Sequence, residues 1–139
     1  MGSHLYANCG LRAPQGTFTN NWIRSNLGCS MRLGITEYID CAHFLPGHAK
    51  CGQVHGHTYK VEVVIEGESD RGGMVVDFND LKTRTREVLQ KYDHRHWNDV
   101  LERPTVENIC ALLSRQLRER IPFPLVIRVW EGNGKWAEM

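Results

Sequence analysis

The stretch Cys51–Glu66, CGQVHGHTYKVEVVIE, decides which fold this sequence predicts. From residue 57 onward it alternates between two kinds of residue, which is typical of a strand with one buried face, because successive side chains point to opposite sides. One set is His57, Tyr59, Val61, Val63 and Ile65, and the other is Thr58, Lys60, Glu62 and Glu66. His55 continues the first set, so two histidines lie on the face that is expected to be covered.

Residues 32–43 predict a second strand, upstream of the first. The residues of shared parity are Leu33, Ile35, Ile39, Cys41 and His43, and Glu37 interrupts them. If the two strands pair as a hairpin, His43 and His55 both lie beside the connecting loop. The pair then brings three histidines to one end of one face.

The rest of the chain predicts two helices and two more strands. Asp77 can cap a helix with the stripe Phe78, Leu81, Thr85, Val88, Leu89 and Tyr92. A second helix is expected from about Thr105, with the stripe Val106, Ile109, Cys110, Leu113 and Leu117. LVIRVWE at 125–131 reads as a strand, and KWAEM at 135–139 as a short edge strand. The order ββααββ predicts an α+β fold, a four-stranded antiparallel sheet with two helices on one face.

Length and composition predict one ordinary domain and exclude several broad classes. The 139 residues carry a formal net charge of +1, which gives no support to a general nucleic-acid or acidic-membrane role. No apolar run approaches the roughly 20 residues of a membrane span, and no signal peptide is visible. The five cysteines are odd in number and scattered, which favours reduced thiols and the cytoplasm.

Residues 1–32 are expected to be an irregular N-terminal arm, followed by one domain at 33–139. Gly, Asn, Ser and Thr are frequent in this arm, and no period is sustained. Its opening Met-Gly-Ser-His resembles the remnant of an expression tag. No internal repeat or low-complexity segment interrupts the predicted domain.

Four polar side chains lie at the margin of the face that the helices should cover: His43, His55, His57 and Glu131. A core does not need them there, because buried polar groups cost free energy unless they are satisfied. Three neutral imidazoles are a common set of catalytic zinc ligands, which leaves one coordination position of the metal open.

Two other interpretations remain for Cys51: it could be the fourth ligand of a closed structural zinc site, or it could be a buried small hydrophobe. We interpret His48 and His96 as loop residues, and a lone Asp93–His94 pair is usually only a local hydrogen bond.

Five segments, taken in order, resemble the successive motifs of the 6-pyruvoyltetrahydropterin synthase superfamily. They are CAHFLPGHAKCGQVHGHTYKVEV, VVDFNDLK, YDHRHWND, RPTVENIC and VWE. The spacing Cys-x3-His-Gly-His is most similar to the 6-carboxytetrahydropterin synthase branch, and the resemblance spans residues 33–131. The sequence departs at IDCAH, where aromatic-x-Ala-Ala-His is more usual, and at His96, where related sequences often carry another residue.

This resemblance implies a tunnelling fold (T-fold), whose sheets join into a barrel in a homo-oligomer, often a hexamer of two trimers. It also implies that the proton-transfer groups meet across a subunit interface. The implied roles are zinc binding by His43, His55 and His57, proton transfer by Cys51, Asp93 and His94, and pterin binding by Glu131, Thr105 and Glu107.

The same resemblance implies a lyase that acts on 7,8-dihydroneopterin triphosphate. Zinc would acidify a C–H of the substrate side chain, and a thiolate would take the proton. In the carboxy branch, loss of triphosphate and acetaldehyde leaves 6-carboxy-5,6,7,8-tetrahydropterin, a precursor of queuosine and other deazapurine bases of tRNA. Two alternatives stay open: a 6-pyruvoyltetrahydropterin synthase that forms the biopterin precursor, and a zinc-stabilised binding module without turnover. Cys51 together with Asp93 and His94 disfavours the binding module, since a closed structural site needs no proton-handling pair.

Overall fold

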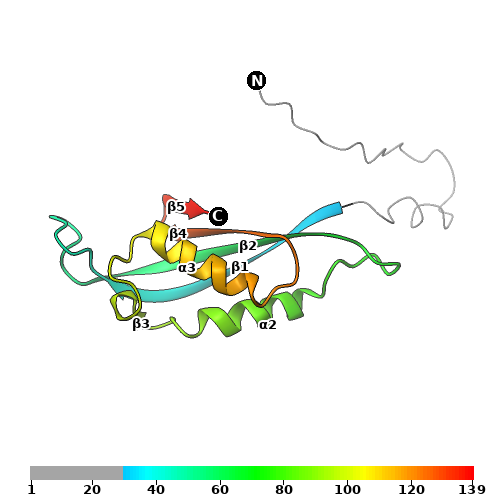
Figure 1. The fold of residues 1–139 in the computed structure, drawn as a ribbon, viewed down its shortest axis with the longest axis horizontal. Coiled ribbons are helices and arrows are strands. Elements are labelled where there is room, and N and C mark those ends of the chain that lie inside the picture. The colour runs from blue at the N-terminus through cyan, green and yellow to red at the C-terminus, as the bar shows by residue number, and fades with distance from the viewer. Residues whose placement is uncertain (1–29) are drawn as a thin grey trace, which may run out of the picture.

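The computed structural model describes residues 30–139, which form a five-stranded sheet and two α-helices (Figure 1). The strands are β1 (Ser30–His43), β2 (His55–Glu68), β3 (Arg95–His96), β4 (Leu125–Glu131) and β5 (Lys135–Glu138). The helices are α2 (Phe78–Leu89) and α3 (Val106–Arg118), and a 3₁₀ turn, η1, spans Trp97–Asp99. None of these helices is both long and apolar enough to cross a membrane.

A long antiparallel hairpin of β1 and β2 forms the centre of the sheet. Across the sheet the order is β3-β1-β2-β4-β5. The register pairs Cys41 with His57 and His43 with His55. Because directly opposite residues of an antiparallel pair lie on the same face, this register fixes where the histidines meet.

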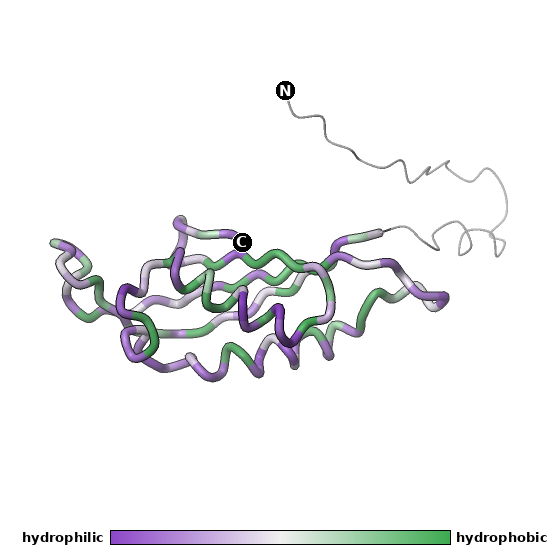
Figure 2. Tube along the Cα trace, in the orientation of Figure 1, coloured by the Kyte–Doolittle hydropathy of each residue, from purple (hydrophilic) through white to green (hydrophobic). Residues whose placement is uncertain are grey.

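One face of the sheet is buried, and it is the face that the alternation predicts. Val61, Val63 and Ile65 of β2 are fully buried, as are Ile127 and Val129 of β4. Figure 2 shows hydrophobic and hydrophilic residues interleaved along the strands. Burying each such side chain contributes roughly 1.5–3 kcal/mol, so this face supplies most of the driving force for packing the helices.

Both helices begin where the sequence predicts, and each starts at a side-chain cap. Asp77 accepts a hydrogen bond from the Asn79 N–H at 2.7 Å, and Thr105 accepts one from Asn108 at 3.3 Å. The predicted stripes are buried, apart from Val106, which is half-buried, and Phe78, which is 53% exposed. Phe78 is the first residue of α2, and helical side chains tilt toward the N-terminus, so it projects away from the turns that contact the sheet.

Glu37, the residue that interrupts the apolar parity of β1, is buried on the covered face. Its carboxylate pairs with Arg86 at 2.5 Å and lies 3.8 Å from Lys82, both on α2. A buried carboxylate is tolerated only when it is paired and hydrogen-bonded. The charged residue therefore joins β1 to α2 within an otherwise apolar face.

Two expectations about the sheet need correction. The sheet has five strands and is mixed, because β3 pairs in parallel with the end of β1, through Cys41–Arg95 and Ala42–His96. Trp97, which is buried directly after β3, holds this segment against the core. In addition, β1 already begins at Ser30, inside the segment expected to be an arm; residues 1–29 of that arm lie outside the described residues.

Candidate active site

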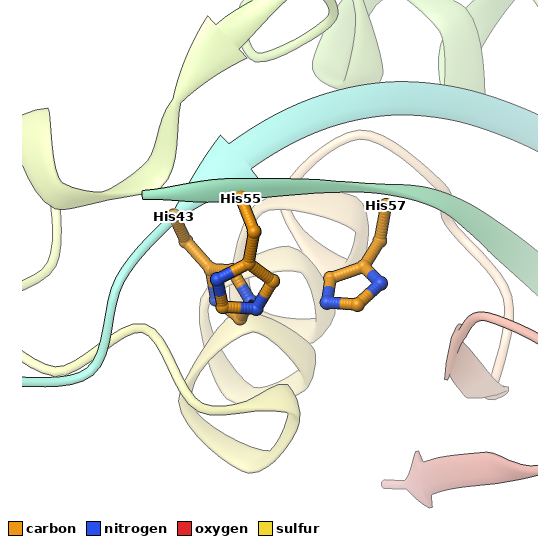
Figure 3. Close-up of side chains that lie close together, drawn as sticks. All are labelled: His43, His55 and His57. Atoms are coloured by element: carbon orange, nitrogen blue, oxygen red, sulfur yellow. Dashed lines mark hydrogen bonds between the residues drawn. The ribbon is translucent and has the colours of Figure 1, made fainter. Parts of the chain in front are cut away.

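The three predicted histidines lie together at one end of the covered face. In Figure 3 their rings extend to the same side, His43 from β1 and His55 and His57 from β2. One ring nitrogen from each lies within 4.8 Å of those of the other two. His43 is buried, and His55 and His57 are half-buried, so the cluster opens toward solvent on one side.

Backbone carbonyls fix the tautomers of two of these rings. The Pro104 carbonyl lies 2.8 Å from Nδ1 of His43, and the Gln53 carbonyl lies 2.8 Å from Nδ1 of His55. A carbonyl oxygen can only accept, so each Nδ1 carries the proton and each Nε2 keeps a lone pair. Carbonyl partners of this kind orient metal-binding histidines in many proteins.

The donor set fits a zinc ion. Nε2 of His43 and Nε2 of His55 are only 3.1 Å apart, although both are acceptors in the tautomers just described. Nε2 of His57 is buried and has no hydrogen-bond partner among the described residues. Zn–N bonds of about 2.0–2.1 Å in a tetrahedral site separate two ligand nitrogens by roughly 3.3 Å, close to the 3.1 Å between the Nε2 atoms of His43 and His55. A cation held by all three would satisfy every one of these lone pairs.

Burial favours the neutral, metal-binding form of His43 and of His57. Burial lowers the pKa of His43 and of His57 below the ordinary value, and the neighbouring histidines lower both further. The Glu131 carboxylate acts in the opposite direction, but the net shift is downward for both rings. Neutral imidazole is the form that binds zinc, so metal affinity should fall as the pH drops and protons compete.

Glu131, at the end of β4, lies beside the histidines. Its two oxygens are 3.8 Å from Nε2 of His57 and 4.0 Å from Nε2 of His43. Burial alone would raise the pKa of Glu131, but the hydrogen bond from Lys135 and the positive charge of that lysine together lower it. An ionised, half-buried carboxylate thus lies at the edge of the candidate metal centre.

Cys51 lies in the loop between β1 and β2, which its own backbone helps to close. The Cys51 carbonyl accepts from the Leu45 N–H at 2.8 Å, and the Cys51 N–H donates to Nδ1 of His48 at 3.0 Å. At the start of the loop, the Asn98 side chain bonds both the N–H and the carbonyl of Phe44. Cys51 is half-buried, whereas Cys41 is buried. This burial raises the pKa of the Cys41 thiol to about 12. Of the cysteines in residues 30–139, Cys51 alone is not buried.

Asp93 and His94 form the expected pair, and backbone contacts hold it. Nδ1 of His94 lies 3.0 Å from Oδ1 of Asp93, which also accepts from the Asp40 N–H at 3.0 Å. The His94 N–H donates to the Asp40 carbonyl at 2.7 Å, and His94 adopts a positive φ of 57°. The imidazole side chain is 78% exposed and so is free to meet another molecule.

Asp93 and His94 directly precede β3, the edge strand of the sheet, and form a group separate from His43, His55 and His57. His94 lines an open depression of about 590 Å³, together with Asp40 and Thr58 of the polar parity and with His57 of the cluster. No hydrogen bond joins Cys51 to Asp93 or His94 within residues 30–139. Cys51 and the Asp93–His94 pair, predicted to act together, thus share no hydrogen bond, ion pair or candidate ligand group within residues 30–139 of one chain.

Thr105 and Glu107 mark the start of α3, next to the histidine cluster. Pro104, the residue before Thr105, bonds His43 through its carbonyl. The Thr105 hydroxyl oxygen caps α3, and Glu107 is exposed in its first turn. The helix start is thus close to the centre, while the Thr105 side chain already has a structural partner.

Two residues beside the histidine cluster and Glu131 were not predicted from the sequence. The Tyr59 hydroxyl lies 3.4 Å from Nδ1 of His43, and Nζ of Lys135 lies 3.0 Å from Oε1 of Glu131. Tyr59 reads as an ordinary core residue by parity. Lys135 could have been found from the sequence EGNGK, since a glycine-containing three-residue hairpin places Lys135 opposite Glu131.

The described domain has relatives in sequence. The model of the family described as 6-pyruvoyl tetrahydropterin synthase matches residues 32–139. A protein of Archaeoglobus fulgidus, provisionally named 6-carboxy-5,6,7,8-tetrahydropterin synthase, is 47% identical over 109 residues, which cover 78% of this chain and 95% of the relative. A dihydroneopterin monophosphate aldolase of Pyrococcus furiosus is 39% identical over 90 residues, 63% of this chain and 78% of that protein.

The fold has solved counterparts. The 6-pyruvoyl tetrahydropterin synthase of Caenorhabditis elegans superimposes with a TM-score of 0.72, at 22% identity, over 80% of this chain and 95% of that chain. At this level of identity the likeness concerns the fold alone. It identifies the sheet and its two helices as a T-fold subunit.

Proposed function

This chain belongs to the 6-pyruvoyl tetrahydropterin synthase family, and on that premise we propose that it is a zinc-dependent lyase forming 6-carboxy-5,6,7,8-tetrahydropterin. The substrate proposed is 7,8-dihydroneopterin triphosphate, which with one water molecule would give this product together with triphosphate and acetaldehyde. That the chain is an enzyme, a pterin lyase, follows from the family and its named relatives. The observation that carries the finer proposal is the three-histidine centre with an ionised carboxylate at its edge.

His43, His55 and His57 would hold the zinc, with one coordination position left for the substrate. The bound ion would supply Lewis acidity, which holds the side-chain hydroxyls of the substrate and acidifies the adjacent C–H. Cys51 would not be a ligand, because its sulfur is not among the ligand atoms that lie within 4.8 Å of one another in this group. Its place in the neighbouring loop suits a base that takes the acidified proton.

Asp93 and His94 would serve the active site of a neighbouring copy of the chain. In one chain they lie beside the edge strand β3 and are held by the backbone of Asp40, whereas Cys51 lies in the loop between β1 and β2. A second chain could bring its exposed His94 to the Cys51 loop of the first. Asp93 would hold the imidazole in one orientation while it donates or relays a proton.

Glu131 would anchor the pterin ring. The flat edge of a pterin presents two adjacent N–H donors, and the two oxygens of one carboxylate can accept both. Such charge-assisted paired bonds fix orientation and would place the substrate side chain over the zinc. Thr105 and Glu107, at the start of α3, would border the same ring.

Glu131→Gln should weaken pterin binding by about 1.5 to 3 kcal/mol, the range for a hydrogen bond to a charged group. Glutamine keeps the shape but loses the charge and one acceptor, and the zinc content should not change. The measurement is a calorimetric titration of a non-reactive pterin product into both proteins. Glu62→Gln is the matched control, because Glu62 lies on the opposite face beside Lys60. Equal affinities of wild type and Glu131→Gln would show that Glu131 does not hold the ring.

The same site could serve two other reactions of related chemistry. A 6-pyruvoyltetrahydropterin synthase needs the same zinc, thiol and pterin anchor but only rearranges the side chain after triphosphate loss. The aldolase relative suggests cleavage of a monophosphate substrate. Incubation with 7,8-dihydroneopterin triphosphate, followed by chromatography and mass spectrometry, separates these outcomes. The proposal expects 6-carboxy-5,6,7,8-tetrahydropterin and acetaldehyde; a 6-pyruvoyl product, or no product at all, would overturn it.

A zinc-stabilised binding module without turnover is the alternative from another class. Its metal would be fully enclosed by protein ligands, with Cys51 as the fourth. The exposed Asp93–His94 pair and the half-buried Glu131 would then have no role. Both features are expected of an enzyme that moves protons and holds a polar ring.

We propose a homo-oligomer larger than a dimer, a hexamer being the family expectation. An active site shared between chains needs an oligomer, and the edges of the sheet give a second reason. β5 is the terminal strand at one edge, and at the other edge β3 pairs with only residues 41–42 of β1. Open edges need partners or protection. Light scattering should give a mass several times the 16.0 kDa of one chain. A monomer at working concentration would rule out the shared site.

The proposed pathway, partners and cellular location follow from the product, from the charge of the chain and from its cysteines. The proposed product would feed the synthesis of queuosine and other deazapurine bases of tRNA, and the enzyme would need no nucleic-acid or membrane partner. The small net charge of +1 is consistent with a small-molecule substrate rather than a polyanionic surface. Three free cysteines among residues 30–139 agree with the proposed cytoplasmic location.

A further inference from the structure

The β4–β5 hairpin places a lysine next to the proposed pterin anchor. Glu131 and Lys135 are directly opposite one another in the antiparallel pair, and residues 132–134 form the turn. Gly132 has a φ of 63°, a conformation that suits glycine at such a turn. Opposite residues share a face, so the register alone sends Lys135 to the side of the sheet that carries the histidines.

The contact between the two side chains is close and leaves the lysine with unused donors. Nζ of Lys135 lies 3.0 Å from Oε1 of Glu131, the oxygen that is also 3.8 Å from His57. An ammonium group has three donors, and Glu131 takes one of them. Lys135 has no other hydrogen-bond or ion-pair partner within residues 30–139. Its side chain is 69% exposed, so the remaining donors are accessible to a ligand.

The pair presents three polar atoms in an order that complements a pterin. On one edge of the pterin ring, the carbonyl oxygen O4 is an acceptor, and the adjacent N3–H and 2-amino groups are donors. Lys135, Oε1 and Oε2 present donor, acceptor and acceptor in the same sequence. If Glu131 accepts from N3–H and the amino group, the next atom along that edge is O4, on the side where a lysine donor is available.

We propose that Lys135 is a specificity-determining residue that donates a hydrogen bond to O4 of the pterin held by Glu131. This inference rests on the proposed function, because it takes Glu131 as the pterin anchor. The lysine makes the site selective for a ring with an acceptor at position 4. A ring with an amino group there would set a donor against an ammonium ion, with no acceptor between them.

The test is a titration of two ligands into full-length, zinc-loaded protein. One ligand is a non-reactive pterin with oxygen at position 4. The other is its 4-thioxo analogue, which keeps both N–H donors but replaces O4 by sulfur, a weak acceptor. Lys135→Met removes the donors and keeps the apolar stem. Lys60→Met is the matched control, because Lys60 pairs with Glu62 at 2.9 Å on the opposite face.

Lys135→Met should bind the oxo ligand at least about tenfold more weakly than wild type, which is the lower end of the range for one hydrogen bond to a charged group. Its affinity for the thioxo ligand should change less than about twofold, so the preference of wild type for oxygen disappears. Lys60→Met should match wild type with both ligands.

Three results would overturn this role for Lys135. Unchanged affinity for the oxo ligand would mean that the lysine does not touch the ring. Equal losses with both ligands would mean that it acts only by holding Glu131. A loss confined to phosphorylated pterins would place it on the phosphate chain. If wild type binds no pterin at all, the proposed function fails together with the inference; if wild type binds and only the Lys135 result differs, the inference alone fails.

Discussion

His57→Ala is expected to lose its zinc, and catalytic turnover with it. Three imidazoles converge on one point, and Nε2 of His57 is buried with no hydrogen-bond partner among the described residues. With that ligand removed, only two protein donors remain, and the affinity should fall by more than about a hundredfold, since even outer-shell changes cost ten- to a hundredfold. Metal analysis of the purified, dialysed protein should give about one zinc ion per wild-type chain and almost none for the variant.

His96→Ala is the control for this experiment. His96 lies close to the same end of the sheet, with its ring centroid 5.8 Å from that of Phe44, but it is not part of the cluster. This variant should retain its zinc. If His57→Ala retained a full complement of metal, the three histidines would not be the site.

Cys51→Ala is expected to keep its fold and its zinc but to lose turnover by at least about a hundredfold, the usual scale for a positioned base. The thiol lies in a loop whose closure uses the backbone of Cys51 rather than its sulfur. Steady-state kinetics should therefore show a fall in kcat with little change in zinc content or in circular dichroism. Cys51→Ser should also be slow, because a hydroxyl is a far weaker acid than a thiol.

Two outcomes would argue against this role for Cys51. Near-normal activity of Cys51→Ala would remove the thiol from the mechanism. Loss of zinc as complete as in His57→Ala would make Cys51 the fourth ligand of a closed structural site. The two variants together thus separate a catalytic centre from a structural one.

The sequence predicts the central hairpin and the histidine cluster well, because both depend on local rules. Alternation over residues 57–66 fixes which face of β2 is covered. A hairpin then brings His43 opposite His55 without any long-range information. The caps at Asp77 and Thr105 are equally local, since each bonds a backbone N–H two or three residues away.

The features that sequence reasoning misses depend on contacts between distant segments. β3 consists of two residues, too few to give a period, and it exists because Cys41 and Ala42 offer an edge for pairing. The burial of Glu37 depends on cations of α2 that are distant in sequence. That Asp93 and His94 lie at the β3 edge of the sheet, bonded to the backbone of Asp40, follows only from the assembled sheet.

Reconstitution of metal-stripped protein with zinc tests most directly whether the histidine cluster is a catalytic centre. The full-length protein is treated with a chelator, and turnover of 7,8-dihydroneopterin triphosphate is measured as zinc is added back. Activity should be absent at the start, rise in proportion to the zinc added, and reach a plateau at one equivalent per chain. Full activity in stripped protein, or tight binding of one zinc ion without any turnover, would contradict this account of the site.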